Sequence, residues 1–125
     1  MNSMPSPHEP DLDELVGEWL DWSEAGERLE LSVSKVRQLI REHQLAAAVP
    51  VEGAGQKVPA ALIMDGAVVK GVGGVLTVLH DASYDDREAL TWLFTADPSL
   101  PGRPIDALRE NRGAEVKRRA QALGF

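Results

Sequence analysis

The chain has no cysteine, few aromatic residues and no long apolar run. Without cysteine it has neither a disulfide framework nor a cysteine-based zinc site, which fits a reducing cytoplasm. No stretch approaches the roughly 20 consecutive apolar residues that a membrane-spanning helix needs. The N-terminal segment lacks the positively charged start and apolar centre of a secretion signal. We therefore expect a cytoplasmic protein of about one domain, with no membrane partner.

Basic residues are also scarce. The chain has 13 lysines and arginines against 20 aspartates and glutamates, for a formal net charge of −7. Residues 31–60 and 101–125 carry more basic than acidic side chains, whereas residues 1–30 and 61–100 are acidic. Any binding to nucleic acid is therefore expected from the two basic segments, with weak non-specific affinity and strong salt dependence.

Motifs of enzymes and metal sites are missing as well. Lys70 follows a glycine-containing stretch, but no Ser or Thr comes after it, as a phosphate-binding loop requires. The aspartates near position 85 lack the glycine and glutamate of a calcium loop. The three histidines, at positions 8, 43 and 80, have no metal-ligand spacing. We therefore expect no enzyme, no cofactor and no metal ion, and we expect His43 to cap or pack at a helix end.

Residues 23–45 have the pattern of a helix-turn-helix, a unit whose second helix can lie in the DNA major groove. Ala25 and Gly26 are small enough for two helices to approach closely. Ser32 is a good N-cap for the second helix, because its hydroxyl accepts a bond from an otherwise unpaired N–H.

The turn between these helices has one unusual residue. Leu29 and Leu31 are expected to fill the corner between the helices. Glu30 stands where such turns usually have a left-handed Gly, a conformation that is costly for other residues. We therefore expect a turn of different geometry.

The expected second helix, residues 33–42, has two distinct faces. The apolar side chains predicted to face the core are Val33, Val36, Leu39 and Ile40. The polar side chains that share the opposite face are Ser34, Arg37, Gln38 and Arg41. Base and phosphate contacts are assigned to Arg37, Gln38 and Arg41, whose groups are those used on DNA. Ser34 and Lys35 are assigned to phosphate. The same pattern also fits an ordinary helix pair with a solvated face.

A short hairpin is expected directly after this helix. Residues 45–51 are apolar and predict a strand, residues 52–55 have turn chemistry, and residues 56–58 predict the returning strand. Pro59 would end it. A hairpin in this position is a wing, and Lys57 is its candidate DNA contact.

The remaining segments complete a fold that is mainly α with a small β wing. Residues 1–10 predict a disordered tail. Residues 11–64 are expected to form the winged helix-turn-helix domain, and residues 65–125 a C-terminal helical bundle. In the bundle, helices are expected after the glycines at 71–74, over 85–95, from Pro104, and over 112–123 with Val116, Ala120 and Leu123 inward.

The C-terminal half carries a distinctive string of residues. It runs through Val68-Val69-Lys70, Leu76 to Asp81, Tyr84, Trp92 to Thr95, Asp97-Pro98-Ser99, Arg103 to Leu108 and Glu115 to Ala122. With it, the chain resembles the small two-part DNA-binding proteins of actinobacteria, including mycobacteria. That family has an N-terminal winged helix-turn-helix and a C-terminal helical region of unknown function.

The resemblance implies binding to double-stranded DNA, with a transcriptional or nucleoid-associated role. By position, the recognition helix would use Ser34, Lys35, Arg37, Gln38 and Arg41, and the wing would be residues 53–57. The resemblance also implies a Ser/Thr kinase partner acting on the N-terminal tail. That tail contains no Thr and only two serines, Ser3 and Ser6.

A fainter resemblance gives an alternative function. Residues 86–123 are similar to the toxin-binding domains of some antitoxins, which also join a helix-turn-helix to this element. In that interpretation the C-terminal half binds a protein partner. Phe125 is then a candidate docking residue, although we expect it to pack into the protein's own core.

Overall fold

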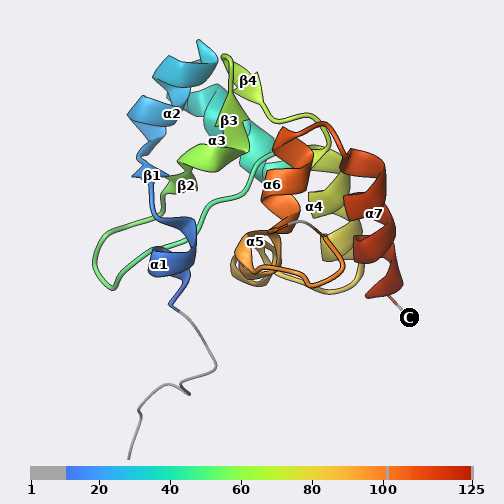
Figure 1. The fold of residues 1–125 in the computed structure, drawn as a ribbon. Coiled ribbons are helices and arrows are strands. Elements are labelled where there is room, and N and C mark those ends of the chain that lie inside the picture. Colours follow the sequence, from blue (N-terminus) through green and yellow to red (C-terminus); the bar gives the residue numbers. More distant parts are fainter. Residues whose placement is uncertain (1–10, 101, 125) are drawn as a thin grey trace, which may run out of the picture.

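Helices account for most of the structure and the strands are only two residues long, so the chain is mainly α, as predicted (Figure 1). The computed structural model describes residues 11–100 and 102–124. The tail predicted for residues 1–10, with its two serines, lies outside the described residues, as does Phe125. In the described part, no helix is long and apolar enough to cross a membrane.

The N-terminal half begins with a short helix. Helix α1 (Leu12–Val16) is capped by the carboxylate of Asp11, which accepts a hydrogen bond from the first turn. Strand β1 (Trp19–Leu20) follows. The helix-turn-helix is then formed by α2 (Trp22–Leu29) and α3 (Val33–Arg41), which pack against each other.

The wing is smaller than the sequence predicts. Strand β2 (Val58–Pro59) pairs antiparallel with β1 rather than with residues 45–51, which do not form a continuous strand. In that segment only Ala48 bridges to Lys57, through two backbone hydrogen bonds of 2.8 and 3.0 Å. One cause lies in Pro50, which has no N–H to donate to a ladder.

A tight hairpin connects the wing to the C-terminal helices. A single 3-10 turn, η1 (Ala60–Leu62), leads into β3 (Ile63–Met64), which pairs antiparallel with β4 (Ala67–Val68). Asp65 and Gly66 form the turn between the two strands, both with positive φ, at 53° and 80°. The hairpin packs against α2 and so braces the first helix of the helix-turn-helix.

Four helices form the C-terminal half: α4 (Val72–Asp81), α5 (Asp86–Phe94), α6 (Pro104–Arg109) and α7 (Gly113–Ala122). Helices α4 and α6 each contact both α5 and α7 (Figure 1). Asp85 caps α5 in a capping box with Glu88, and the helix lies within the predicted residues 85–95.

Two predictions for this half are wrong in detail. Helix α4 begins at Val72, so Gly73 and Gly74 lie inside it and only Gly71, at φ 94°, interrupts the chain. Glycine lowers helix propensity without forbidding the helix, and the buried apolar residues of α4 prevail. Leu123 is 38% exposed instead of buried, because α7 ends at Ala122 and Leu123 lies beyond its buried stripe.

The two halves share one continuous apolar core. Leu20 and Val36 from the N-terminal half and Leu79 and Phe94 from the C-terminal half belong to the same buried cluster. The contact of α1 with α5 extends that core across the molecule. The winged domain therefore rests on the C-terminal helices and shares its hydrophobic stabilisation with them.

Two arginines of the C-terminal half also hold the N-terminal half. The Arg103 guanidinium donates to the Leu15 carbonyl of α1 at 3.2 Å, and Arg109 donates to the Ala61 carbonyl at 2.8 Å. Arg103 also bonds both carboxylate oxygens of Asp106, at 2.9 and 3.0 Å. These bonds hold the pKa of Asp106 below its ordinary value, against the opposing effect of burial.

Candidate nucleic-acid interface

The approach of α2 to α3 depends on a residue without a side chain. A Cβ atom built on Gly26 would lie 2.7 Å from the carbonyl oxygen of Leu31, closer than real Cβ contacts. Ala25 beside it is fully buried. The prediction that these two small residues allow close packing is confirmed. Ser32 then caps α3, its hydroxyl accepting from the Lys35 N–H at 3.2 Å.

The turn keeps the left-handed geometry that the sequence seemed to disfavour. Glu30 has φ 57° and ψ 42°, and its N–H bonds back to the carbonyl of Glu27. The expectation of a differently built turn is therefore wrong. The close packing at Gly26 fixes the path of the chain, and Glu30 adopts the conformation that this path needs at some conformational cost.

The inner face of α3 is narrower than predicted. Val36 is fully buried, whereas Leu39 and Ile40 are half-buried and pack against the core. Leu31 and Val33 are 40% and 36% exposed, so these two predictions are wrong. Both residues follow the left-handed turn, where the chain leaves α2, and Leu29 alone fills the corner.

The outer face of α3 presents the predicted polar residues to solvent. Those that are exposed are Ser34, Lys35, Arg37 and Arg41, while Gln38 is half-buried. Among the described residues, neither Arg37 nor Arg41 forms an ion pair with a carboxylate. Two guanidinium groups one turn apart are thus available to an external partner.

Gln38 differs from the arginines because its amide is already occupied. Its Nε2 donates to the Glu42 carboxylate at 3.1 Å, one turn further along the helix. This pair places an acidic group beside the polar face. A base contact by Gln38 would therefore require its amide to leave Glu42.

A groove runs between α3 and the wing. It is lined by Trp22, Arg37, Ile40, Arg41 and Gln56. The structure thus brings the two candidate arginines together with Gln56, a wing residue that the sequence interpretation did not single out. No local pattern marks Gln56, because its position depends on the path of the wing loop.

Lys57, the predicted wing contact, lies at the base of the wing. It is half-buried, and its backbone forms the bridge to Ala48. The loop between them has two glycines with positive φ, Gly53 and Gly55, and an exposed Glu52. Glu52 at the wing tip reduces the attraction of this loop for phosphate.

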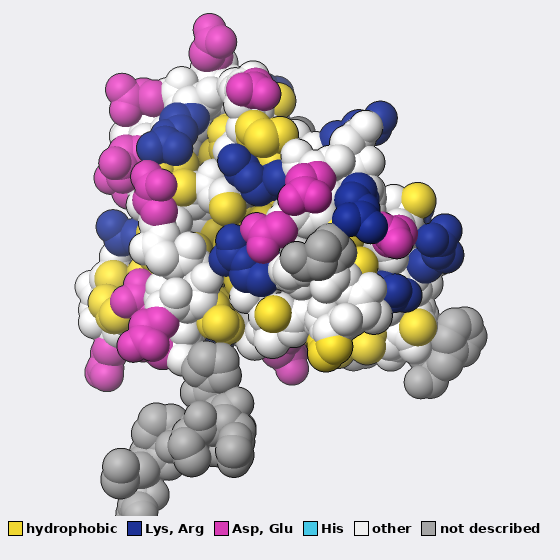
Figure 2. Space-filling model, in the orientation of Figure 1, with side chains coloured by type: hydrophobic (Ala, Val, Ile, Leu, Met, Phe, Trp, Pro, Cys, Tyr) yellow, Lys and Arg dark blue, Asp and Glu magenta, His cyan; other side chains and the backbone are white. Residues whose placement is uncertain are grey.

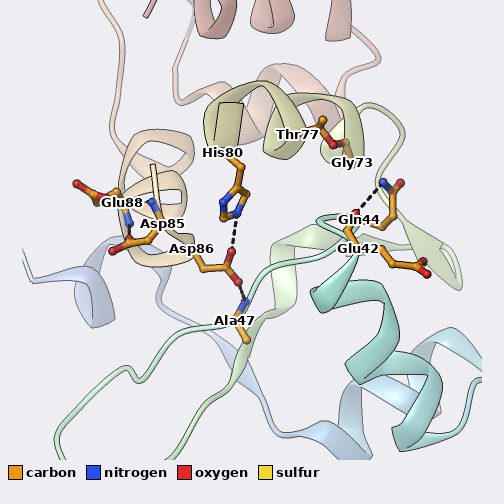
Figure 3. A network of polar contacts seen from close by, with 9 residues as sticks. All are labelled: Glu42, Gln44, Ala47, Gly73, Thr77, His80, Asp85, Asp86 and Glu88. Atoms are coloured by element: carbon orange, nitrogen blue, oxygen red, sulfur yellow. Dashed lines mark hydrogen bonds and ion pairs between the residues drawn. The ribbon is translucent and has the colours of Figure 1, made fainter. Parts of the chain in front are cut away.

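Helix α5 holds the segment that enters the wing, residues 47–49. The Asp86 carboxylate accepts the backbone N–H of Ala47 at 3.4 Å, as Figure 3 shows. One residue on, the Arg87 guanidinium donates to the Val49 carbonyl at 2.9 Å. The C-terminal half therefore fixes the wing relative to α3.

Charge is distributed unevenly over the molecule. Acidic side chains gather over the region of α1 and α2 in Figure 2, where Glu24, Glu27 and Glu30 are exposed. Arg28 is paired with Glu18 at 3.2 Å. The first helix of this helix-turn-helix is therefore a poor surface for phosphate. The exposed cations Lys35, Arg37 and Arg41 lie on α3 instead.

The fold and the exposed face of α3 define a winged helix-turn-helix protein with a C-terminal helical domain. Residues 9–63 match the family model "DNA-binding protein Rv2175c, wHTH domain". Residues 69–124 match the "Rv2175c C-terminal domain of unknown function". The chain therefore belongs to the Rv2175c family, as the sequence resemblance predicted.

One relative and one solved structure give the extent of this similarity. The chain is 40% identical over 118 residues to "DNA-binding protein Rv2175c" of Mycobacterium tuberculosis (strain ATCC 25618 / H37Rv), covering 84% of this chain and 80% of the relative. It also matches the NMR structure of Rv2175c with a TM-score of 0.76 and 36% identity. That match covers 99% of this chain and 87% of the other.

Proposed function

We propose that the protein binds double-stranded DNA, with α3 in the major groove, and acts in transcriptional regulation. The observation that carries this proposal is that Arg37 and Arg41 lie on an exposed helix face, within the groove shared with the wing, and form no ion pair with any carboxylate of residues 11–100 and 102–124. Guanidinium groups form bidentate contacts with guanine and with phosphate. The name of the mycobacterial relative supports the same function.

The remaining residues of the interface have subordinate roles. Ser34 and Lys35 lie in the first turn of α3, where backbone N–H groups and a positive side chain favour a phosphate. Gln38 would read an adenine after release from Glu42. Lys57 and Gln56 at the wing would contact the DNA backbone.

Electrostatics limit the strength of non-specific binding. The net charge is −7 and the helix before α3 is acidic, so few phosphates are neutralised at once. The slope of log affinity against log salt is about −0.9 per phosphate contact. With few phosphate contacts we expect a shallower slope than the strong salt dependence expected from the composition, and a large share of base contacts in the specific complex. A DNA-bound protein of this kind would be nucleoid-associated in the cytoplasm.

Binding of the full chain to a pool of duplexes tests the proposal. Anisotropy of labelled DNA at low and moderate salt would be measured for the wild type and for Arg37→Ala and Arg41→Ala. We expect each substitution to weaken the selected complex by roughly 1–3 kcal/mol, which is about 5-fold to 150-fold.

The matched control removes the same charge elsewhere. Lys117 and Arg118 are exposed on α7, and replacing both with alanine should change affinity by less than about twofold, through long-range electrostatics alone. Equal losses in the control and in an Arg37/Arg41 double variant would contradict the assignment of the face. Absence of duplex binding at either salt would instead favour the C-terminal helices as a protein-binding module.

A further inference from the structure

Three metal-ligating side chains from separate elements meet between the two halves of the molecule. They are His43, just after α3, His80 in the last turn of α4, and Asp86 in the first turn of α5. Their ligand atoms all lie within 4.8 Å of one another. Positions 43, 80 and 86 do not have a metal-ligand spacing in the sequence, and the fold brings them together.

Two of the three groups are already in contact. His80 Nε2 lies 2.7 Å from Asp86 Oδ1, and Figure 3 shows the imidazole pointing from α4 toward α5. The His43 ring stacks on the His80 ring, with centroids 3.8 Å apart and planes 24° from parallel. His43 packs at a helix end, as predicted, but its partner is a second histidine.

His43 also has an unsatisfied polar atom. Its Nδ1 is buried and has no hydrogen-bond partner among residues 11–100 and 102–124. A buried ring nitrogen without a partner is costly, and such atoms in proteins are commonly explained by a bound water or ion. Since the His80 imidazole and the Asp86 carboxylate lie close to the His43 ring, a bound ion suits this site.

We propose that His43, His80 and Asp86 bind one divalent transition-metal cation of the class that prefers imidazole, such as Zn²⁺. Two imidazoles and one carboxylate form a common donor set for these ions, and a water molecule completes four-fold coordination. The second oxygen of Asp86 keeps its bond to the Ala47 N–H, which orients the carboxylate.

Binding requires two rearrangements. The hydrogen bond between His80 Nε2 and Asp86 Oδ1, at 2.7 Å, must open and release its proton to solvent as the ion takes its place. The second is a turn of one ring, which can be measured. The lone pairs of an imidazole lie in the plane of its ring, so two stacked rings cannot direct nitrogens at one ion. One ring must turn about its χ2 angle and leave the stack. The ion would then cross-link the end of α3 to α4 and α5, in place of a ring contact.

Titration of the full chain with Zn²⁺, without DNA, tests the proposal. We expect about one ion per chain by calorimetry and a higher melting temperature in the presence of the ion, because the ion binds the folded state. With Co²⁺ as the probe, a visible absorption band of tetrahedral type should appear. Loss of mutual ring-current shifts at the two imidazoles in NMR spectra would report the unstacking.

Substitutions identify the ligands. His43→Asn, His80→Asn and Asp86→Asn should each lower the affinity at least about tenfold, since loss of an outer-sphere partner alone costs 10–100-fold. The matched controls are Asp81→Asn, an exposed carboxylate beside His80 on the same helix, and His8→Asn, the remaining histidine. Both should bind like the wild type.

Two results would overturn the proposal. One is a wild-type chain that is folded by circular dichroism and binds neither Zn²⁺ nor Co²⁺, which would leave a water molecule as the partner of His43 Nδ1. The other is binding that all three ligand substitutions leave unchanged. Neither result depends on whether the protein binds DNA.

Discussion

Helices α3 and α4 are of similar length, but α4 buries more of its side chains than α3 does. In α3 only Val36 is fully buried, and the outer face is polar and exposed. In α4 the buried residues are Val72, Val75, Leu76 and Leu79. The candidate DNA-contacting helix thus supplies little of the core, and a helix of the other half supplies much of it.

This difference explains how a small domain can present so polar a helix. Each Å² of buried apolar surface stabilises the fold by about 25 cal/mol, and the narrow apolar stripe of α3 buries little of it. The other helices must therefore bury the apolar surface that a stable fold needs. The C-terminal helices supply that burial and also hold the winged half through Arg103, Arg109 and Arg87. We infer that they act as a scaffold for the recognition surface.

A matched pair of leucine truncations should give the largest effect. Leu79 of α4 is fully buried, and Leu79→Ala is expected to lower the free energy of unfolding by about 2–5 kcal/mol through lost burial and a cavity. Leu39 of α3 is half-buried, so Leu39→Ala should lower it by less, about 1–2 kcal/mol. Urea denaturation measures both. Equal losses would mean that α3 carries as much of the core as α4.

Two glycine substitutions sharpen the comparison by their opposite signs. Gly26→Ala places a methyl group against the Leu31 carbonyl and should destabilise the chain by about 1–3 kcal/mol. Gly74→Ala, in α4, meets nothing within 4 Å and should stabilise it by up to about 1 kcal/mol. Thermal melts of both variants check the signs, and a destabilised Gly74→Ala would show that α4 is tightly enclosed there.

Relief of the left-handed turn should have a smaller effect. Glu30→Gly removes the conformational cost of φ 57° but makes the unfolded chain more flexible. We expect a net gain of about 0.5–1 kcal/mol in the free energy of unfolding. The control is Glu27→Gly inside α2, which should lose about 1 kcal/mol. Two losses of the same size would indicate that the turn at Glu30 is unstrained.

The Arg103–Asp106 pair should give the smallest effect, and that effect should depend on pH. The pKa of Asp106 is lowered in the folded chain, chiefly by hydrogen bonds from Arg103. Its contribution is therefore fully present above the unfolded pKa of about 4 and is lost as the pH falls through the lower folded pKa.

Asp106→Asn tests this sign. The variant should be less stable than the wild type at pH 7, and the difference should shrink below about pH 4 as the wild-type carboxyl protonates. Urea midpoints between pH 2 and pH 7 measure it. A difference that does not change with pH would mean that the charge of the Asp106 carboxylate does not contribute to stability.

The local features of the fold could be predicted from the sequence. Ser32 caps α3 as predicted, and helices form within residues 85–95 and from Pro104 as predicted. Hydrogen bonding and backbone preferences act over a few residues, so their signals are readable in the sequence. The family resemblance extended this to the order of the two domains.

The predictions that were wrong concern features that depend on contacts between segments far apart in the sequence. The wing is smaller than predicted because β2 pairs with β1, whose Leu20 lies 38 residues before Val58. Glu30 adopts a left-handed conformation because of the contact at Gly26. The stacking of His43 on His80 and the place of Gln56 beside Arg37 likewise depend on tertiary packing. No periodicity in the sequence carries that information.

The most direct test of the recognition surface is a titration of the isotope-labelled full chain with a selected duplex, followed through backbone amide chemical shifts. We expect the largest changes on residues 33–41 and on the wing loop 52–57, with small changes along α7. The largest changes on α6 and α7, with α3 unmoved, would contradict this expectation and assign the interaction surface to the C-terminal half.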